Sequence, residues 1–511
     1  MFQSFEATSS PDQGPPRLKA LREKMSAAGL DAFLVPRADA HQGEYVAPCD
    51  ERLSWLTGFT GSAGFAAIAP DSAGIFIDGR YRLQVKEQIA SDFTPVHWPE
   101  TKLGPWLINT LPSNAKVGFD PWLHTVTELR GLTKSLEAAG IALSAVPNLV
   151  DAIWDDRPGR PKAPLLVHAI EIAGESSADK RGRLAAELRA AKRDAVVLTL
   201  PDSICWLLNI RGSDIPRNPL AQGFAVLDAA GKVSFFTNAT ADETVILHLG
   251  NDVSLHPYTG LTAFLETLSG TIQLDPASAP ETVRAVLADI ETIEVVDGGD
   301  PCILPKAQKT DAEIAATREA HLRDGAAMVE FLSWFDDRAA DGGLTEIDAA
   351  KSLEGFRRAT NALHDISFDT ISGSGPNGAI VHYRVTEGTN RTIQPGDLYL
   401  VDSGGQYIDG TTDITRTIVV GAPTDEHRAC FTRVLQGMIA ISCARFPRGL
   451  SGRDLDALAR APLWRAGLDY DHGTGHGVGV FLSVHEGPQR ISRMSEVPFM
   501  PGMILSNEPG Y

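Results

Sequence analysis

The spacing of apolar residues along the first half of the chain predicts alternating helices and strands. Apolar positions recur every three or four residues over Arg17–Ala28, as in a helix, and the apolar run Asp31–Pro36 predicts a short buried strand. The same order returns at Arg183–Lys192 and Asp194–Thr199. Layered α/β structure is therefore expected here. The 16 residues before Arg17 are polar and proline-rich, and we expect a flexible tail.

The two helix–strand units are followed by segments that also resemble each other. Ser54–Ser62 and Cys205–Ser213 both carry Trp-Leu near the start and Gly-Ser at the end. The simplest interpretation is two copies of one α/β unit, the first with an insertion around His41–Glu51. The alternative is chance recurrence of such patterns in an alanine-rich sequence.

Two boundaries divide the chain. Residues 155–164 have the composition of a linker. Thr310–Glu313 is a capping box that predicts the start of a long helix towards Trp334. The expected domains are 1–160, 161–308 and 309–511. In the last, short strands and glycine-rich turns dominate from Asp365 onwards, with helices expected over 345–359, 425–444 and 452–466.

Composition excludes several classes of protein. Lys+Arg total 46 and Asp+Glu total 65, and the formal charge of −19 disfavours a nucleic-acid binder. No stretch approaches 18 uncharged apolar residues, and the N-terminus lacks the apolar core of a signal peptide. The five cysteines form no CxxC pair, which argues against a disulfide framework or a cysteine-based zinc site. We expect a cytoplasmic protein that binds neither membranes nor nucleic acid.

The segment from Leu398 to Val420 predicts a β-hairpin with two aspartates. A turn centred between Tyr407 and Ile408 would pair Asp402 directly with Asp413. Carboxylates so placed repel each other unless a cation lies between them. The alternative is a pair of solvent-facing carboxylates near a turn.

Two further segments carry potential metal ligands. His472 and His476 lie among four glycines, too poor a helix former for the helical His-x-x-x-His of zinc peptidases. Glu508 follows an apolar run and precedes Pro509. Each residue taken alone could be structural. Together two aspartates, a histidine and a glutamate suit Mn²⁺, Fe²⁺ or Co²⁺ at least as well as zinc, and bridging carboxylates favour two ions.

These segments resemble a known family. Val401–Gly404, Gly410–Arg416, His472–Gly477, Val484–Pro488 and Asn507–Gly510 match, in order, motifs of the pita-bread metallopeptidases, which include methionine aminopeptidase, prolidase and aminopeptidase P. Upstream, three segments resemble the three-domain cytosolic type of Xaa-Pro aminopeptidase: Asp39–Pro48, Gly58–Gly64 and Gly212–Pro219. The resemblance implies an α/β and α+β protein with two related creatinase-like N-terminal domains and a C-terminal pita-bread domain.

The resemblance also implies roles for individual residues. Asp402, Asp413, His476 and Glu508 are the implied ligands of two divalent metal ions, with Mn²⁺ expected first and Zn²⁺ or Co²⁺ as alternatives. The implied catalytic residues are His382, His472 and His485, with Glu508 as a proton acceptor. From its neighbours alone, His382 would be interpreted as a buried strand histidine. His41 and Arg80 are weaker candidates for contacting substrate from the N-terminal domain.

One departure from the family pattern concerns the end of the chain. The family uses a fifth ligand, a second bridging glutamate on a strand about 14 residues beyond the motif that holds Glu508. This chain stops at Tyr511. We therefore expect the sequence to be incomplete, and the implied activity to belong to the complete protein.

The resemblance implies a metalloaminopeptidase that removes the N-terminal residue from peptides with proline in second position, by a metal-bridging hydroxide. The nearest alternative is Xaa-Pro dipeptidase (prolidase), and a more distant one is a non-catalytic pita-bread peptide-binding protein. A metal-free creatinase is disfavoured by the carboxylates of Asp402 and Asp413. The resemblance also implies a homodimer. Trp464 matches a dimer-contact position of the family, but it could equally be a tryptophan of the core.

Overall fold

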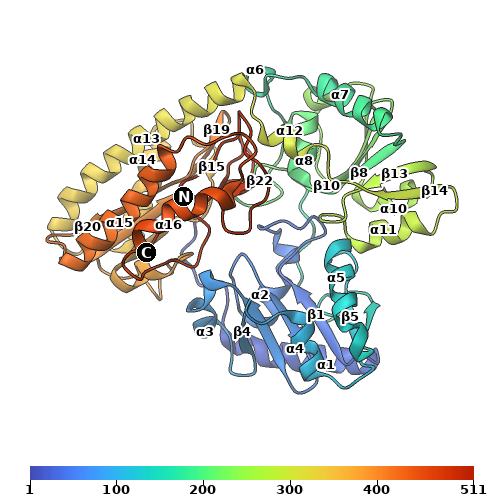
Figure 1. Ribbon diagram of the computed structural model, residues 1–511, viewed down its shortest axis with the longest axis horizontal. Helices are drawn as coiled ribbons and strands as arrows, with labels where there is room; N and C mark the ends of the chain where they lie inside the picture. Colours follow the sequence, from blue (N-terminus) through green and yellow to red (C-terminus); the bar gives the residue numbers. More distant parts are fainter.

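Two six-stranded sheets with one topology build the first 300 residues of the protein (Figure 1). The structure is a computed structural model and describes residues 1–511. The first sheet has the strand order β4-β3-β2-β1-β5-β6 and the second has the order β12-β11-β10-β8-β13-β14. In each sheet the central strand pairs antiparallel on one side and parallel on the other. The predicted repeat is therefore confirmed.

The elements of the first two domains have the following bounds. The first sheet comprises β1 (Ala32–Pro36), β2 (Phe65–Ile68), β3 (Ala73–Ile77), β4 (Thr94–His97), β5 (Lys116–Phe119) and β6 (Ala142–Ala145), with helices α1 (Gly14–Ala27), α2 (Arg52–Thr57), α3 (Gln84–Gln88), α4 (Leu103–Thr110) and α5 (Val126–Leu136). The second comprises β8 (Ala195–Leu198), β10 (Gly223–Asp228), β11 (Val233–Thr237), β12 (Val253–Pro257), β13 (Gly270–Leu274) and β14 (Ile293–Asp297), with helices α7 (Ser177–Ala190), α8 (Pro201–Leu208), α9 (Glu243–Leu249), α10 (Leu261–Leu265) and α11 (Glu281–Ala288).

The insertion expected in the first copy is also present. The chain runs from the end of β1 at Pro36 to the start of α2 at Arg52, whereas β8 ends at Leu198 and α8 starts at Pro201. The additional residues form a segment without helix or strand except for the short turn Pro48–Asp50. This insertion contains Glu44, which contacts the third domain.

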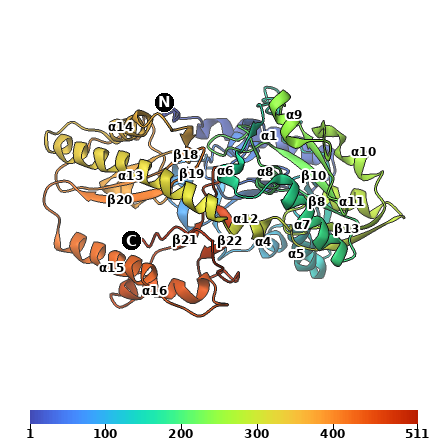
Figure 2. The same cartoon turned by 90° about the horizontal axis from the view of Figure 1, so that it is seen from above.

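The third domain places short strands between two helix pairs, α13–α14 and α15–α16 (Figure 2). The predicted capping box at Thr310 is present, and the second helix, expected from residue 345, also begins with a capping box at Thr345. The first helix continues past Trp334 to Ala340. The elements are α12 (Ile303–Ala307), α13 (Asp311–Ala340), α14 (Glu346–Ala359), β15 (Asp365–Ile366), β16 (Ile371–Ser374), β17 (Leu398–Ser403), β18 (Gly405–Tyr407), β19 (Gly410–Thr411), β20 (Ile414–Val419), α15 (Asp425–Ser442), α16 (Gly452–Trp464), β21 (Gly475–Gly477) and β22 (Glu486–Ile491).

The expected register of the hairpin was wrong by two residues. Asp402 lies opposite Thr415, not Asp413, because the turn lies beyond Tyr407, which pairs with Gly410. Asp413 lies between β19 and β20, outside either strand. The strands are interrupted at Gly404, which packs too closely against Thr412 for any side chain. Asp402 and Asp413 are thus diagonal rather than direct neighbours.

The expectation of a flexible N-terminal tail was also wrong. The first residues lie on the third domain, where the N-terminus is marked in Figure 1. The Phe2 amide donates to Glu354 at 3.0 Å, and Phe5 packs in a cluster with Phe368 and Val484. Phe5, an apolar residue in a polar segment, provides this contact.

The structure also bears on the expectations for the cysteines, for membrane-spanning helices and for Trp464. All five cysteines are free, and Cys49, Cys205 and Cys302 are buried. No helix combines the length and apolar character that crossing a bilayer requires. Trp464 is 44% exposed, which excludes the interpretation of a core tryptophan.

Candidate metal centre

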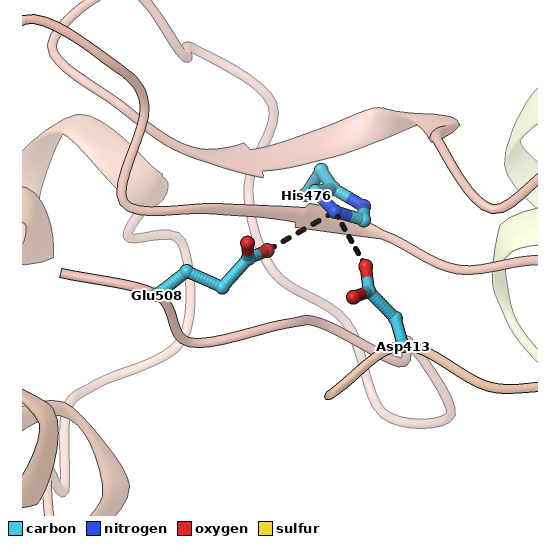
Figure 3. Close-up of side chains that lie close together, drawn as sticks. All are labelled: Asp413, His476 and Glu508. Atoms are coloured by element: carbon cyan, nitrogen blue, oxygen red, sulfur yellow. Dashed lines mark ion pairs between the residues drawn. The ribbon is translucent and has the colours of Figure 1, made fainter. Parts of the chain in front are cut away.

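Three side chains from separate parts of the third domain meet at one point (Figure 3). His476 Nε2 lies 3.2 Å from Asp413 Oδ2 and 3.1 Å from Glu508 Oε1. One ligand atom from each of the three residues lies within 4.8 Å of the others. This is the spacing of atoms that can bind a common cation.

Backbone pairing fixes two of these residues relative to each other. His476 is the middle residue of β21, and its carbonyl accepts a hydrogen bond from the Ser506 amide at 2.8 Å. The Glu508 amide in turn donates to Thr474 O at 2.6 Å. Gly475 makes this approach possible, since a Cβ there would overlap Ser506 O. The final residues are therefore held against β21.

The electrostatics of the cluster favour a cation. Burial alone would lower the pKa of His476, but Asp413 and Glu508 outweigh it and raise that pKa to about 11. Burial would likewise raise the pKa of Glu508, but His476 lowers it to about 2. The two carboxylates thus stabilise positive charge beside Nε2. A metal ion bound between the three side chains would be stabilised by the same carboxylates.

Asp402, the fourth predicted ligand, lies beside this cluster rather than within it. It is on β17, outside the group of atoms within 4.8 Å. Burial, and next the negative charges of Asp413 and Glu508, raise the pKa of Asp402 well above its usual range. Its Oδ1 atom is buried without a hydrogen-bond partner. A divalent cation would provide the missing partner and relieve the repulsion.

The donor set fits divalent metal ions. His476 Nδ1 lies 2.8 Å from Gly477 O, and a proton shared there leaves the Nε2 lone pair free for a metal. One imidazole and three carboxylates are the ligands of Mn²⁺, Fe²⁺ or Co²⁺ as much as of Zn²⁺. Asp402, Asp413, His476 and Glu508 are therefore the residues that could hold metal.

Two of the predicted catalytic histidines are held by the N-terminal domain. His382 Nδ1 lies 2.8 Å from the hydroxyl of Tyr81, and His485 Nδ1 lies 2.6 Å from Glu44. The ring of His485 stands edge-on to His476, with centroids 4.3 Å apart. His382 is in a turn, not a strand. The N-terminal domain thus reaches the edge of the candidate metal centre.

Charge and burial give these side chains different protonation states. Burial, with the charges of Arg80 and His485, lowers the pKa of His382 to about 3, so its ring is neutral at neutral pH. Burial raises the pKa of Glu44, but the imidazole of His485 outweighs it and lowers that pKa well below its usual range. The third predicted histidine, His472, has its pKa lowered by burial, and Nδ1 lies 2.8 Å from Gly473 O.

The two weaker candidates differ in position. Arg80 is 24% exposed, pairs with Asp78 at 2.7 Å and acts electrostatically on His382 and Glu44, so it borders the site. The structure does not bring His41 to the cluster. His41 is buried between the first two domains, with Nδ1 on Thr199 O and Nε2 on the Tyr258 hydroxyl, both at 3.0 Å.

Three further residues, which were not predicted from the sequence, belong to this network: Glu44, Ser62 and Tyr81. Ser62 joins the other two, with its hydroxyl 3.0 Å from Glu44 Oε1 and 2.7 Å from the Tyr81 oxygen. Glu44 and Ser62 lie in segments that resemble the Xaa-Pro aminopeptidases, whereas Tyr81 lies outside them, next to the candidate Arg80. The resemblance of these segments was the only indication of a role in the sequence. The histidines that Tyr81 and Glu44 contact lie more than 300 residues further along the chain.

Family models match all three parts of the chain. A model described as metallopeptidase family M24 matches residues 315–511. Two models described as the creatinase/prolidase N-terminal domain match residues 17–153 and 156–313. The two sheets and the strand-rich third domain correspond to these matches.

The chain is also similar to curated relatives and to proteins of solved structure. A probable Xaa-Pro aminopeptidase P of Coccidioides posadasii is 40% identical over 99% of this chain and 81% of its own length. The X-prolyl aminopeptidase of Caenorhabditis elegans, described as a cytosolic enzyme with a di-nuclear active site, has a TM-score of 0.91 and 35% identity, and the match covers 97% of this chain and 84% of that one. The prolidase of Pyrococcus horikoshii shares the fold at a TM-score of 0.51 and 24% identity, over 65% of this chain and 90% of that one.

Proposed function

The chain belongs to the Xaa-Pro aminopeptidase P family of M24 metallopeptidases, and we propose from this premise that it removes the N-terminal residue from peptides whose second residue is proline. The observation that carries the proposal is the convergence of Asp413, His476 and Glu508, with Asp402 beside them, in a chain of this family. The enzyme is a metal-dependent hydrolase.

Two divalent ions are proposed at Asp402, Asp413, His476 and Glu508, with Mn²⁺ expected first and Zn²⁺ or Co²⁺ as alternatives. Bound there, such ions would lower the pKa of water and polarise the peptide carbonyl. The carboxylates hold the ions, and Glu508, at the outer end of the cluster, is also proposed to accept a proton from the attacking water.

The histidines are proposed to act on the substrate. His382 is neutral, so we assign it a hydrogen bond to the peptide rather than proton donation. His485, whose Nδ1 faces the Glu44 carboxylate, keeps Nε2 available to donate a proton to the leaving proline nitrogen. His472 is assigned to the developing oxyanion.

Proline in second position has a direct chemical consequence. The bond to be cleaved is a tertiary amide without an N–H, so recognition requires space and charge rather than a hydrogen bond to that nitrogen. Arg80 is proposed to bind substrate at the border of the site, because it lies in the N-terminal domain beside His382. His41 is not proposed to contact substrate.

Prolidase remains the nearest alternative. The aminopeptidase structure matches 97% of this chain and the prolidase 65%, which favours the aminopeptidase. The test is release of the first residue from an Xaa-Pro-Xaa tripeptide and from an Xaa-Pro dipeptide, each with Mn²⁺ and with chelator. Metal-dependent cleavage of the tripeptide supports the proposal. Cleavage of the dipeptide alone indicates prolidase, and stoichiometric peptide binding with neither cleavage nor bound metal indicates a binding protein.

The assembly and compartment are proposed by analogy. A homodimer through α16 is supported by the exposed side chain of Trp464. Sedimentation of the protein and of Trp464→Glu tests it, and an unchanged sedimentation coefficient would contradict it. A cytoplasmic location is supported by five free cysteines, because oxidising compartments favour disulfides.

A further inference from the structure

The middle domain contributes no residue to the metal centre, yet one of its side chains enters the third domain. Arg211 on β9 (Ile210–Arg211) is 1% exposed and donates through Nη2 to Val480 O at 2.9 Å and through Nε to Phe481 O. Its remaining bonds go to carbonyl oxygens of its own domain. A side chain from the middle domain therefore holds two consecutive peptide units of the third domain.

This guanidinium is costly to bury. Arg211 has no carboxylate within ion-pair distance, and burial lowers its pKa to about 10, so it remains charged at neutral pH. A buried charge without a counter-ion destabilises a protein unless it organises other groups. Four carbonyl oxygens accept its hydrogen bonds, and the carboxylates of Glu313, Glu486 and Asp202 act on it only from beyond ion-pair distance.

The peptide units that Arg211 holds are strained. Phe481 has a φ of 50°, the left-handed region that aromatic residues rarely occupy. This conformation turns the loop of residues 478–484 back on itself, so that the Gly479 amide bonds to Ser483 O at 3.0 Å. Strained backbone persists where its surroundings hold it, often at functional sites. Hydrogen bonds from Arg211 to the adjoining carbonyls do so here.

The loop leads directly to His485 and also contacts the segment that carries Asp413. Leu482 O accepts hydrogen bonds from Gln406 at 2.8 Å and from the Thr411 hydroxyl at 3.2 Å. Thr411 is two residues before Asp413. The loop therefore lies between the segment that precedes Asp413 and the adjacent histidine, and its own backbone leads into His485.

A second anchor follows His485 at once. Glu486 is fully buried and pairs with Lys306 at 3.0 Å and with Lys309 at 2.5 Å. Lys306, on the linking helix α12, also pairs with Asp202 of the middle domain at 2.9 Å. The backbone on both sides of His485 is therefore fixed from the middle domain and from the segment that joins it to the third domain.

We infer that Arg211 is a positioning residue, through which the middle domain fixes the loop of residues 478–484 and hence the ring of His485 against the metal centre. The inference rests on the proposed aminopeptidase function. Catalysis requires groups placed to within fractions of an ångström, so releasing the loop slows the chemical step while leaving the metal ligands in place.

The test is steady-state cleavage of an Xaa-Pro-Xaa tripeptide by Arg211→Met. We expect kcat to fall roughly ten- to hundredfold, with KM changed less than threefold and bound Mn²⁺ unchanged. Arg211→Lys, which can reach only one of the two carbonyls, should be intermediate. If Arg211→Met is insoluble, the lysine variant decides. The control is Arg181→Met, which removes another buried guanidinium of the middle domain; its partners, Gly231 O and Asp252 at 3.9 Å, lie within that domain.

Hydrogen exchange separates positioning from general destabilisation. Faster exchange confined to residues 478–488, together with reduced kcat, supports the inference. Wild-type kcat in both Arg211 variants overturns it, as does an equal loss of kcat in Arg181→Met. If the wild-type protein itself fails to cleave the tripeptide, the proposed function fails first, so the two failures are distinguishable.

Discussion

The hydroxyl of Tyr81 and Nδ1 of His382 lie 2.8 Å apart, although 301 residues separate them in the sequence. This bond joins the N-terminal domain to a histidine at the edge of the metal centre. A second bond, between Glu44 and His485, joins the same two domains. The N-terminal domain therefore borders the candidate active site, although the proposed metal ligands all lie in the third domain.

Replacing Tyr81 with phenylalanine should slow catalysis without affecting metal binding. The change removes the hydrogen bond to His382 together with the contacts of the Tyr81 oxygen to Ser62. The bond to His382, worth about 1 kcal/mol, corresponds to roughly a fivefold fall in kcat/KM. Tyr258→Phe is the matched control, because it removes a similar bond to His41 away from the centre. Steady-state kinetics with an Xaa-Pro-Xaa tripeptide compare the two. An equal loss in both variants would contradict the assignment.

Removing a proposed metal ligand should abolish stabilisation by metal. At 100 times its Kd, each bound Mn²⁺ ion should stabilise the wild-type protein by about 2.7 kcal/mol. Asp413→Asn should lose most of this increase, and its peptidase activity should fall roughly 100-fold or more. Asp409→Asn is the control, since this carboxylate of the same hairpin pairs with Arg323 outside the cluster. Thermal unfolding with and without Mn²⁺ is the measurement, and an unchanged metal response of Asp413→Asn would refute the site.

The close packing at Gly475 predicts an unusually sensitive backbone position. A Cβ there would overlap Ser506 O and push the segment of Glu508 away from His476. We expect Gly475→Ala to weaken Mn²⁺ binding and to lower kcat roughly tenfold or more. Gly473→Ala is the control in the same loop, because the nearest atom to its Cβ would be 3.8 Å away. The measurement is calorimetric titration with Mn²⁺. Equal Mn²⁺ affinities of Gly475→Ala and Gly473→Ala would contradict the prediction.

The buried carboxyl of Asp300 predicts a pH-dependent stability in the middle domain. Burial raises the pKa of Asp300, the Ser203 hydroxyl and the Cys302 amide oppose this, and the pKa is about 6, above its unfolded value of about 4. The folded state therefore binds more protons in this interval, and stability falls as pH rises from about 4 through 6. Relative to Asp300→Asn, the wild-type protein should lose about 1 kcal/mol between pH 5 and pH 8.

Urea unfolding of the two proteins at both pH values provides the measurement. Asp289→Asn, at an exposed position near α11, serves as the control and should track the wild type. A constant difference between the wild type and Asp300→Asn across this pH range would show that the carboxyl titrates normally.

Local signals in the sequence predicted much of the fold. The capping boxes at Thr310 and Thr345 fix helix starts because their hydrogen bonds involve residues only three apart. The repeat was visible because both copies keep the Trp-Leu and Gly-Ser positions. The hairpin register failed because the interruption at Gly404 depends on how closely the chain packs against Thr412, which local spacing does not encode.

The site was predictable only in part. Asp413, His476 and Glu508 do converge, but Asp402 lies beside them on a neighbouring strand. Contacts between domains were not predictable, since nothing local to Arg211 indicates that its partners are the carbonyls of Val480 and Phe481. Such contacts depend on how three domains assemble, and they require the structure.

The most direct test of the central claim is a comparison of two tripeptides that differ only in having proline or alanine in second position. Release of the first residue is measured by mass spectrometry after chelation and again after Mn²⁺ is restored. The account predicts that only the proline peptide is cleaved, and only with metal present. Cleavage that survives chelation, or equal cleavage of the alanine peptide, would contradict it.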